Sequence, residues 1–236
     1  MLTLRGVDAD DAWCARLRAK VAADLLDIGL PGLTINVRDA DVRESLMTLT
    51  TMDPPVVALV SMWTQQSYGA QVQAATALLQ KECDDVAAYL VTESVPLPPP
   101  LTVPGQRTRG LANVALLRRP TDLDESTWLS RWHIDHTPVA IETQSTFGYI
   151  QNAVVRAVTP DAPVVSAIVE ELFPAEAISD LHAFFGASDD DDLRDRMERM
   201  IASTSAFGAN ENVDTVPTSR FVYRSPFDGG RQKVSR

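Results

Sequence analysis

The sequence predicts an α+β protein made of two ferredoxin-like βαββαβ units in tandem, packed sheet to sheet as a pseudo-dimeric α/β barrel. Three observations predict this fold class. The chain has 236 residues, 45% of them hydrophobic, which suits two small domains. A proline-rich segment divides it near the middle. Both halves show patterns that predict the order strand-helix-strand-strand-helix-strand.

The proline-rich segment sets the predicted domain boundaries. Five prolines fall within 95–105, and proline can continue neither a helix nor a central strand. We therefore expect an extended linker over 96–109. It would join one ferredoxin-like unit over 1–95, a degenerate repeat, to a second over 110–225. Residues 226–236 are expected to form a flexible C-terminal tail.

In each half, apolar runs and alternation predict strands, and apolar residues at spacings of four predict helices. In the first half, Trp13, Leu17, Val21 and Leu25 form such a stripe. The strands expected there are 2–5, 33–37, 56–63 and 86–92, and the helices are 10–26 and 68–81. In the second half, the strands expected are 113–117, 147–158, 164–172 and 215–223, and the helices are 124–144, 174–185 and 190–207.

A ferredoxin-like unit has helices on one face of its sheet and leaves the other face bare. A bare apolar sheet face would expose a large hydrophobic patch. Two units stacked through these faces would bury both and enclose an interior. This reasoning favours one shared core over two independent domains, in a chain that is a monomer with a pseudo-dimeric core or a homodimer.

The composition limits the classes of molecule that this protein is expected to bind. The formal net charge is −11 and no dense cluster of Lys and Arg appears, which disfavours nucleic acid. No apolar stretch reaches the ~18–20 residues of a membrane span, and no signal peptide is recognisable. Cys14 and Cys83 have no metal-site spacing. We expect a cytoplasmic protein whose partner is a small aromatic or apolar ligand, with neither nucleic acid nor membrane as a partner.

The sequence indicates no cofactor and no metal. Phosphate-binding and dinucleotide-binding glycine motifs are missing, as is a serine nucleophile elbow. His133 and His136 are two histidines without the HExxH spacing, whereas a stable metal site needs about three protein ligands.

One helix face carries the strongest candidate site. Trp128, Trp132 and His136 lie at spacings of four and share a face. Histidine exchanges a proton near neutral pH, so this face would suit a flat apolar ligand and one proton transfer. A core histidine between core tryptophans is the alternative. His133 and Arg131 face either the same cavity or solvent, and Arg131 could pair with a substrate carboxylate.

The next strand adds Tyr149 and Asn152. Three residues apart, they point to opposite sheet faces unless a bulge intervenes. Tyr149 would donate a proton to a carbonyl oxygen, and Asn152 would hold such an oxygen by a hydrogen bond. Ordinary strand residues with satisfied polar tips are the alternative.

These residues also carry a family resemblance. The segment 113–223 resembles the EthD family of dimeric α/β-barrel proteins through Leu117–Pro120, Trp128–Pro138 and Tyr149–Asn152. The resemblance implies a ligand cavity between sheet and helices. It also implies kinship with cofactor-free cyclases, dehydratases, decarboxylases, isomerases and monooxygenases. The first half has no such motif and no histidine, so we expect one principal pocket, in the second half.

The function predicted is that of a cofactor-independent lyase or isomerase acting on a small aromatic or apolar carbonyl compound by dehydration, decarboxylation or cyclisation. The catalytic residues would be His136, Tyr149 and Asn152, and the substrate-binding residues Trp128, Trp132, His133 and Arg131. A non-catalytic binding or accessory protein is the first alternative, and a cofactor-free or haem-dependent monooxygenase the second. An open cavity with converging polar groups would favour an enzyme.

Overall fold

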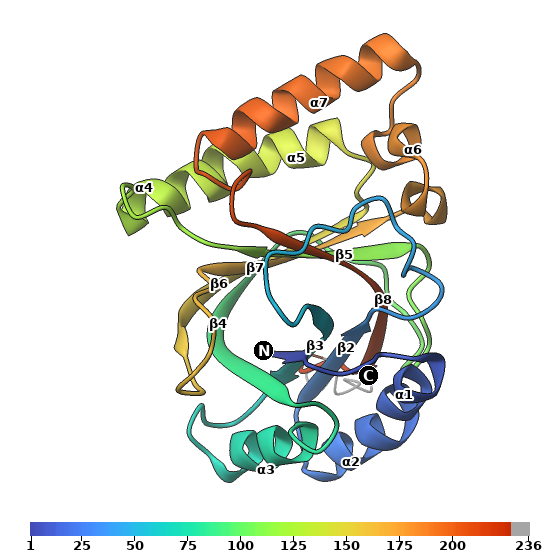
Figure 1. Cartoon of the computed structure of the whole chain (residues 1–236), viewed down its shortest axis with the longest axis vertical. Coiled ribbons are helices and arrows are strands. Elements are labelled where there is room, and N and C mark those ends of the chain that lie inside the picture. The colour runs from blue at the N-terminus through green and yellow to red at the C-terminus, as the bar shows by residue number, and fades with distance from the viewer. Residues whose placement is uncertain (228–236) are drawn as a thin grey trace, which may run out of the picture.

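Eight antiparallel strands close into one barrel (Figure 1). The computed structural model describes residues 1–227. Around the barrel the strands follow the order β1-β3-β2-β8-β5-β7-β6-β4. Their bounds are β1 Leu2–Arg5, β2 Gly32–Val37, β3 Val56–Trp63, β4 Asp85–Leu97, β5 Leu111–Leu117, β6 Gly148–Ala157, β7 Ala167–Phe173 and β8 Asp214–Arg224.

The predicted fold class is wrong. Two ferredoxin-like α/β units packed sheet to sheet would keep two separate sheets, whereas strands from the two halves pair directly by hydrogen bonds. In one seam, Leu33–Val37 of β2 pairs with Ser219–Arg224 of β8. In the other, Tyr89–Leu97 of β4 pairs with Tyr149–Ala157 of β6. Closure satisfies the backbone groups that open sheet edges would leave unpaired.

The helices lie outside the barrel. Figure 1 shows the first-half helices at one end of the molecule and the second-half helices at the other. The first half has α1 (Asp11–Arg16), a π-helical turn η1 (Leu17–Val21), α2 (Ala22–Asp27) and α3 (Ala70–Leu79). The second half has α4 (Glu125–Ser130), a π-helical turn η2 (Arg131–His136), α5 (Thr137–Thr143), a 3-10 turn η3 (Ala175–Ile178), α6 (Leu181–Phe185) and α7 (Asp190–Ser205).

Each predicted strand and helix is therefore present, with β4 extending further than expected, to Leu97. The predicted tail over 226–236 falls, from residue 228 on, outside the described residues. The division into units over 1–95 and 110–225 stays a prediction.

Strand alternation separates an interior core from two outer cores. In β5, Val114 and Leu116 point into the barrel and pack with Leu59 and Tyr89 of the first half. Ala115 and Leu117, on the opposite face of β5, pack instead with tryptophans of the second-half helices. The period of two along each strand thus divides its side chains between barrel and helices.

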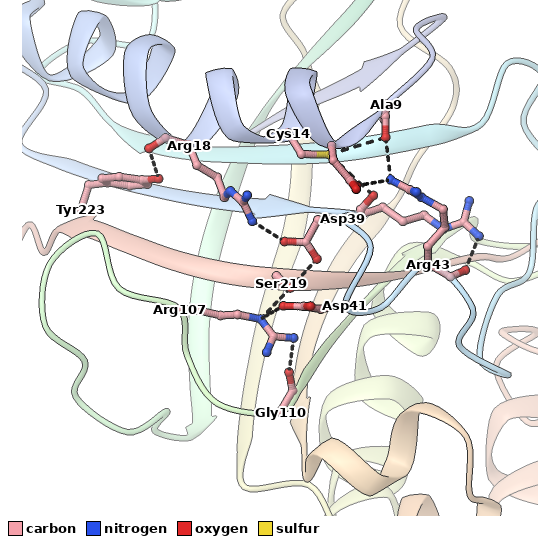
Figure 2. Close-up of polar contacts among 12 residues, drawn as sticks. Ala9, Cys14, Arg18, Asp39, Asp41, Arg43, Arg107, Gly110, Ser219 and Tyr223 are labelled. Carbon is pink, nitrogen blue, oxygen red and sulfur yellow. Dashed lines mark hydrogen bonds and ion pairs between the residues drawn. The ribbon is translucent and has the colours of Figure 1, made fainter.

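A polar network, drawn in Figure 2, holds the linker against strand β8. Asp39, which follows β2, is buried and accepts hydrogen bonds from Arg18 of η1 at 2.6 Å and from Ser219 of β8 at 2.7 Å. Arg107 of the linker donates to the Ser219 hydroxyl oxygen at 2.7 Å and to the Gly110 carbonyl at 3.1 Å. The network joins the first helix, the linker and a strand from the second half.

Loss of the central carboxylate of this network should destabilise the whole barrel. We expect Asp39→Ala to lower the free energy of unfolding by about 2 kcal/mol, because the buried donors around it lose their acceptor. Urea unfolding followed by circular dichroism measures this. Asp24→Ala removes only the exposed Lys20–Asp24 pair and should change stability by less than about 0.5 kcal/mol. Equal effects of the two substitutions would contradict a structural role for the network.

Candidate functional site

Three polar side chains form a row across the helix-facing surface of the second-half sheet. Glu171 of β7 lies opposite Asn113 of β5 in one ladder and opposite Tyr149 of β6 in the next. All three are buried. Cross-strand partners point to the same face of a sheet, so the row presents an amide, a carboxyl and a phenol side by side.

An apolar cavity of about 520 Å³ lies over this row. Its floor is the outer face of β5–β8 and its roof is formed by η2, α6 and α7. Apolar side chains make up most of its wall, including Leu117, Val169, Phe184, Phe185, Met197 and Met200. A volume of this order, with few polar groups, is typical of small-molecule sites. Flexible methionines can adapt to the outline of a bound molecule.

The first half also contributes to the cavity, through the loop between β2 and β3. Leu46, Met47 and Leu49 of this loop line it. Backbone hydrogen bonds of 3.1 and 2.9 Å join Leu49 to Thr215 of β8. Thr51 and Met52 donate to the Asp214 carboxylate at 2.6 and 3.0 Å. Strand β8 therefore holds a segment of the first half over the cavity of the second.

The cavity rim is apolar and open to solvent. Four large side chains that line it are also substantially exposed: Leu46 at 59%, Leu49 at 56%, Ile201 at 56% and Leu181 at 36%. Exposed apolar side chains gathered around an opening are characteristic of an entry route for apolar molecules.

Glu171 is the most strongly perturbed carboxyl of the site. Burial raises its pKa to about 8, because a carboxylate loses its hydration inside an apolar wall. The acid form therefore predominates at neutral pH. Gln144, with its amide nitrogen turned toward the carboxyl, donates to Glu171 Oε1 at 3.0 Å. A carboxyl with a pKa near the working pH can both accept and donate a proton.

His136 of η2 also lines the cavity. Its Nδ1 lies 2.9 Å from the Ser203 hydroxyl of α7, and its ring packs on Phe207 with centroids 4.9 Å apart. Burial lowers the pKa of His136 to about 4, so the imidazole is neutral at pH 7. No hydrogen bond involves Nε2 within residues 1–227.

Tyr149 is the third titratable side chain that lines the cavity. Burial, together with the neighbouring Glu171, raises its pKa far above the usual range. The phenol therefore keeps its proton and acts as a donor. Gln151 and Thr137 lie beside it and are hydrogen-bonded to each other at 2.7 Å.

Pro138 explains how the motif helix is built. A proline has no N–H to bond the carbonyl four residues earlier, and the helix widens into the π-helical turn η2 just before it. The Thr137 amide then bonds the Trp132 carbonyl, five residues back. π-Turns of this kind are frequent at functional sites. The helix continues beyond Pro138 as α5.

Of the predicted site residues, the structure brings His136, Tyr149 and Trp132 together in this cavity. Trp128 packs against Trp132 with ring centroids 5.3 Å apart but lines a different hollow, of about 340 Å³. Asn152 points to the opposite face of β6 from Tyr149, into the barrel, where its amide donates to the Ile168 carbonyl at 3.1 Å.

The remaining two predicted residues do not line the cavity. Arg131 donates to the Ala206 carbonyl at 2.7 Å, beyond the end of α7. His133 packs on Trp132 with centroids 4.3 Å apart. Burial lowers the pKa of His133. These contacts tie η2 to its surroundings.

Sequence reasoning missed Glu171, Asn113, Gln144 and the first-half loop. One signal was available for Glu171. The strand Ala167–Phe173 is apolar except for two consecutive glutamates, and charged residues are rarely placed in a buried strand without a purpose. Alternation sends Glu170 into the barrel, where Asn36 donates to it at 2.8 Å, and Glu171 out to the cavity.

Other parts of the molecule also contain hollows. One end of the barrel has hollows of about 300 and 420 Å³ that share Glu93 and Trp63. Within the described residues, no three His, Cys, Asp or Glu side chains are grouped to hold a metal ion. No helix within residues 1–227 is long and apolar enough to cross a membrane.

Comparison with known proteins adds a likeness of fold. No protein-family model matches this chain, and no curated protein matches it either. Among solved structures, an anthrone oxidase-like protein has a similar fold, with a TM-score of 0.53 and 8% sequence identity. The match covers 95% of this chain and 93% of that one. At this identity the likeness shows the fold alone, and the resemblance to the EthD family stays a prediction.

The raised pKa of Glu171 makes stability depend on pH. Between about 4.5 and about 8 the folded state holds a proton that the unfolded state has released. Stability from this group is therefore complete below pH 4.5 and falls as pH rises to 8. Glu171→Gln lacks this proton, so the stability of the variant relative to wild type should increase across that range. Urea unfolding at several pH values measures the difference.

Glu142→Gln is the matched control, since Glu142 pairs with Arg199 on the surface. Its stability relative to wild type should stay nearly constant from pH 5 to 8. A constant difference for Glu171→Gln as well would show that the Glu171 carboxyl titrates normally.

Proposed function

We propose that this protein is a cofactor-independent enzyme that binds a small, flat, apolar carbonyl compound and moves a proton on a carbon that the carbonyl acidifies, directly or through a conjugated ring. The observation that carries the proposal is the Glu171 carboxyl, with its pKa raised to about 8, at the floor of an apolar cavity. Perturbed carboxyls in such surroundings mark sites of acid–base chemistry. The proposal extends to membership of the EthD family.

Binding would be driven by burial of the ligand's apolar body. The aromatic and methionine side chains of α6 and α7 would cover its faces, and apolar burial is worth roughly 25 cal/mol per Å². The polar floor would then fix the orientation, because the Tyr149 phenol can donate a hydrogen bond to the ligand's carbonyl oxygen.

In the chemical step, Glu171 in its carboxylate form takes the proton. The carbon–hydrogen bond breaks, an O–H bond forms on Glu171, and the electron pair moves to the carbonyl oxygen as an enolate. The neutral Tyr149 phenol donates a hydrogen bond to that oxygen and stabilises the developing charge. Return of the proton to another atom completes an isomerisation; loss of a leaving group completes an elimination.

This mechanism places the base on Glu171 rather than on His136. A base with a pKa of about 4 accepts a proton from carbon far less readily than one with a pKa of about 8. His136 is instead positioned, by Ser203 and Phe207, to hydrogen-bond a ligand through Nε2.

Oxygenation is a second candidate, favoured by the fold shared with an anthrone oxidase-like protein. It begins with the same proton removal. The carbanion then combines with O2 to give a peroxide, which loses water, so that a CH2 group and O2 become a carbonyl group and H2O. The apolar cavity suits both the ligand and O2.

A hydrogen-exchange assay tests the shared step without knowledge of the natural substrate. Anthrone in D2O, without oxygen, should gain deuterium faster with the wild-type protein than without it. The exchange takes place at its CH2 group, which lies across the central ring from the carbonyl and is acidified through the conjugated rings. We expect Glu171→Gln to lower the exchange rate by roughly 100-fold or more, and Glu142→Gln to leave it unchanged. Nuclear magnetic resonance follows the loss of the proton signal.

The pH profile assigns the base. If Glu171 is the base, the exchange rate should rise with pH and level off above about pH 8. If the rate instead levels off just above pH 4, His136 is the base. Binding of anthrone without exchange at any pH would overturn the enzymatic proposal and favour a binding or accessory protein. Oxygen uptake, measured in air, separates oxygenation from isomerisation.

A further inference from the structure

Asn113 is a buried amide in the candidate site that the proposed proton transfer does not use. Its side chain lines the cavity, and the residue is only 3% exposed. Oδ1 is enclosed and has no hydrogen-bond partner within residues 1–227. The amide nitrogen is likewise without a partner among the hydrogen bonds of the described residues.

The neighbours of Asn113 do not satisfy it. Its cross-strand partner on β8 is Pro217, which has no polar side chain, and its partner on β7 is Glu171, which bonds Gln144. A buried polar group without a partner costs about 1–3 kcal/mol. Such a group in a folded protein therefore needs an explanation, and a ligand oxygen in the cavity would supply the missing partner.

The register of the sheet determines how far Asn113 lies from Glu171, the proposed base. Asn113 and Glu171 are directly opposite in the β5–β7 ladder, so their Cβ atoms are about 5 Å apart. An amide that turns by half a rotation presents either its N–H or its C=O. It can therefore donate a hydrogen bond to a ligand carbonyl or accept one from a ligand hydroxyl.

We propose that Asn113 determines specificity by binding a second oxygen of the ligand. Glu171 lies between Asn113 and Tyr149 in the row, so this second oxygen lies on the opposite side of the reacting carbon from the carbonyl oxygen that Tyr149 holds. On an aromatic ring, oxygens on neighbouring carbons lie only about a hydrogen-bond length apart. Oxygens on alternate carbons have one carbon between them, just as Asn113 and Tyr149 have Glu171 between them. The ligand class is therefore flat aromatic compounds with oxygens on alternate carbons, in phenol or keto form. This inference rests on the proposed function.

Two isomers of the same composition and ring size test it. Naphthalene-1,3-diol has its oxygens on alternate carbons and naphthalene-2,3-diol on neighbouring carbons, and 1-naphthol has a single oxygen. Calorimetric titration without oxygen measures their binding and prevents turnover. The wild-type protein should bind the 1,3-isomer roughly 3- to 10-fold more tightly than the 2,3-isomer, as expected for one additional neutral hydrogen bond.

Asn113→Leu should abolish this preference and leave the affinity for 1-naphthol within about twofold of wild type, since leucine has a similar volume and no polar atom. Asn113→Ser keeps a hydroxyl and should retain part of the preference. It provides the comparison if the leucine variant does not fold.

The outcomes separate this inference from the proposed function. If 1-naphthol does not bind the wild-type protein, the cavity is not a site for aromatic ligands and both proposals fail. If 1-naphthol binds but the two diols bind equally, or the preference survives in Asn113→Leu, only the role of Asn113 is overturned.

Discussion

Hydrogen bonds between β2 and β8, and between β4 and β6, are the constraint on which the rest of the structure depends. Each seam joins a strand from the first half to one from the second. An open sheet would leave a row of unpaired backbone groups at either edge. With both seams closed, every strand of the barrel has two neighbours. The two sides of the wall then become different environments: a packed interior, and an outer face available to helices.

Closure of the barrel also places adjacent residues of one strand in different surroundings. Glu170 and Glu171 are consecutive on β7, yet one lies inside the barrel with Asn36 and Arg220 and the other faces the cavity beside Gln144. The interior glutamate has charged and polar partners. The outer one has an apolar roof, and its pKa rises to about 8. Two identical, consecutive side chains thus lie in very different surroundings.

The cavity lies between the outer face of the sheet and the helices of the second half. Elsewhere in the second half, tryptophans and phenylalanines fill the space between sheet and helices. Over Asn113, Glu171 and Tyr149 the roof consists of α6, α7 and the π-helical turn, with a loop from the first half at the entrance. That loop is fastened by Asp214 and Thr215 of β8. The site is therefore shared between the halves, although its polar groups come from one of them.

The sequence by itself determined the local elements and part of the site. Period-two and four-residue patterns located each strand and helix, because these periodicities reflect backbone geometry. The motif helix likewise indicated His136 and Trp132, and strand position indicated Tyr149. Tertiary structure alone decided that β2 meets β8 and β4 meets β6, since nothing local distinguishes closed pairing from stacked sheets. It also placed Asn113 and Glu171, 58 positions apart in the chain, in one register. The unpartnered amide and the desolvated carboxyl form a candidate site only in the folded protein, because burial and cross-strand proximity are properties of the folded chain.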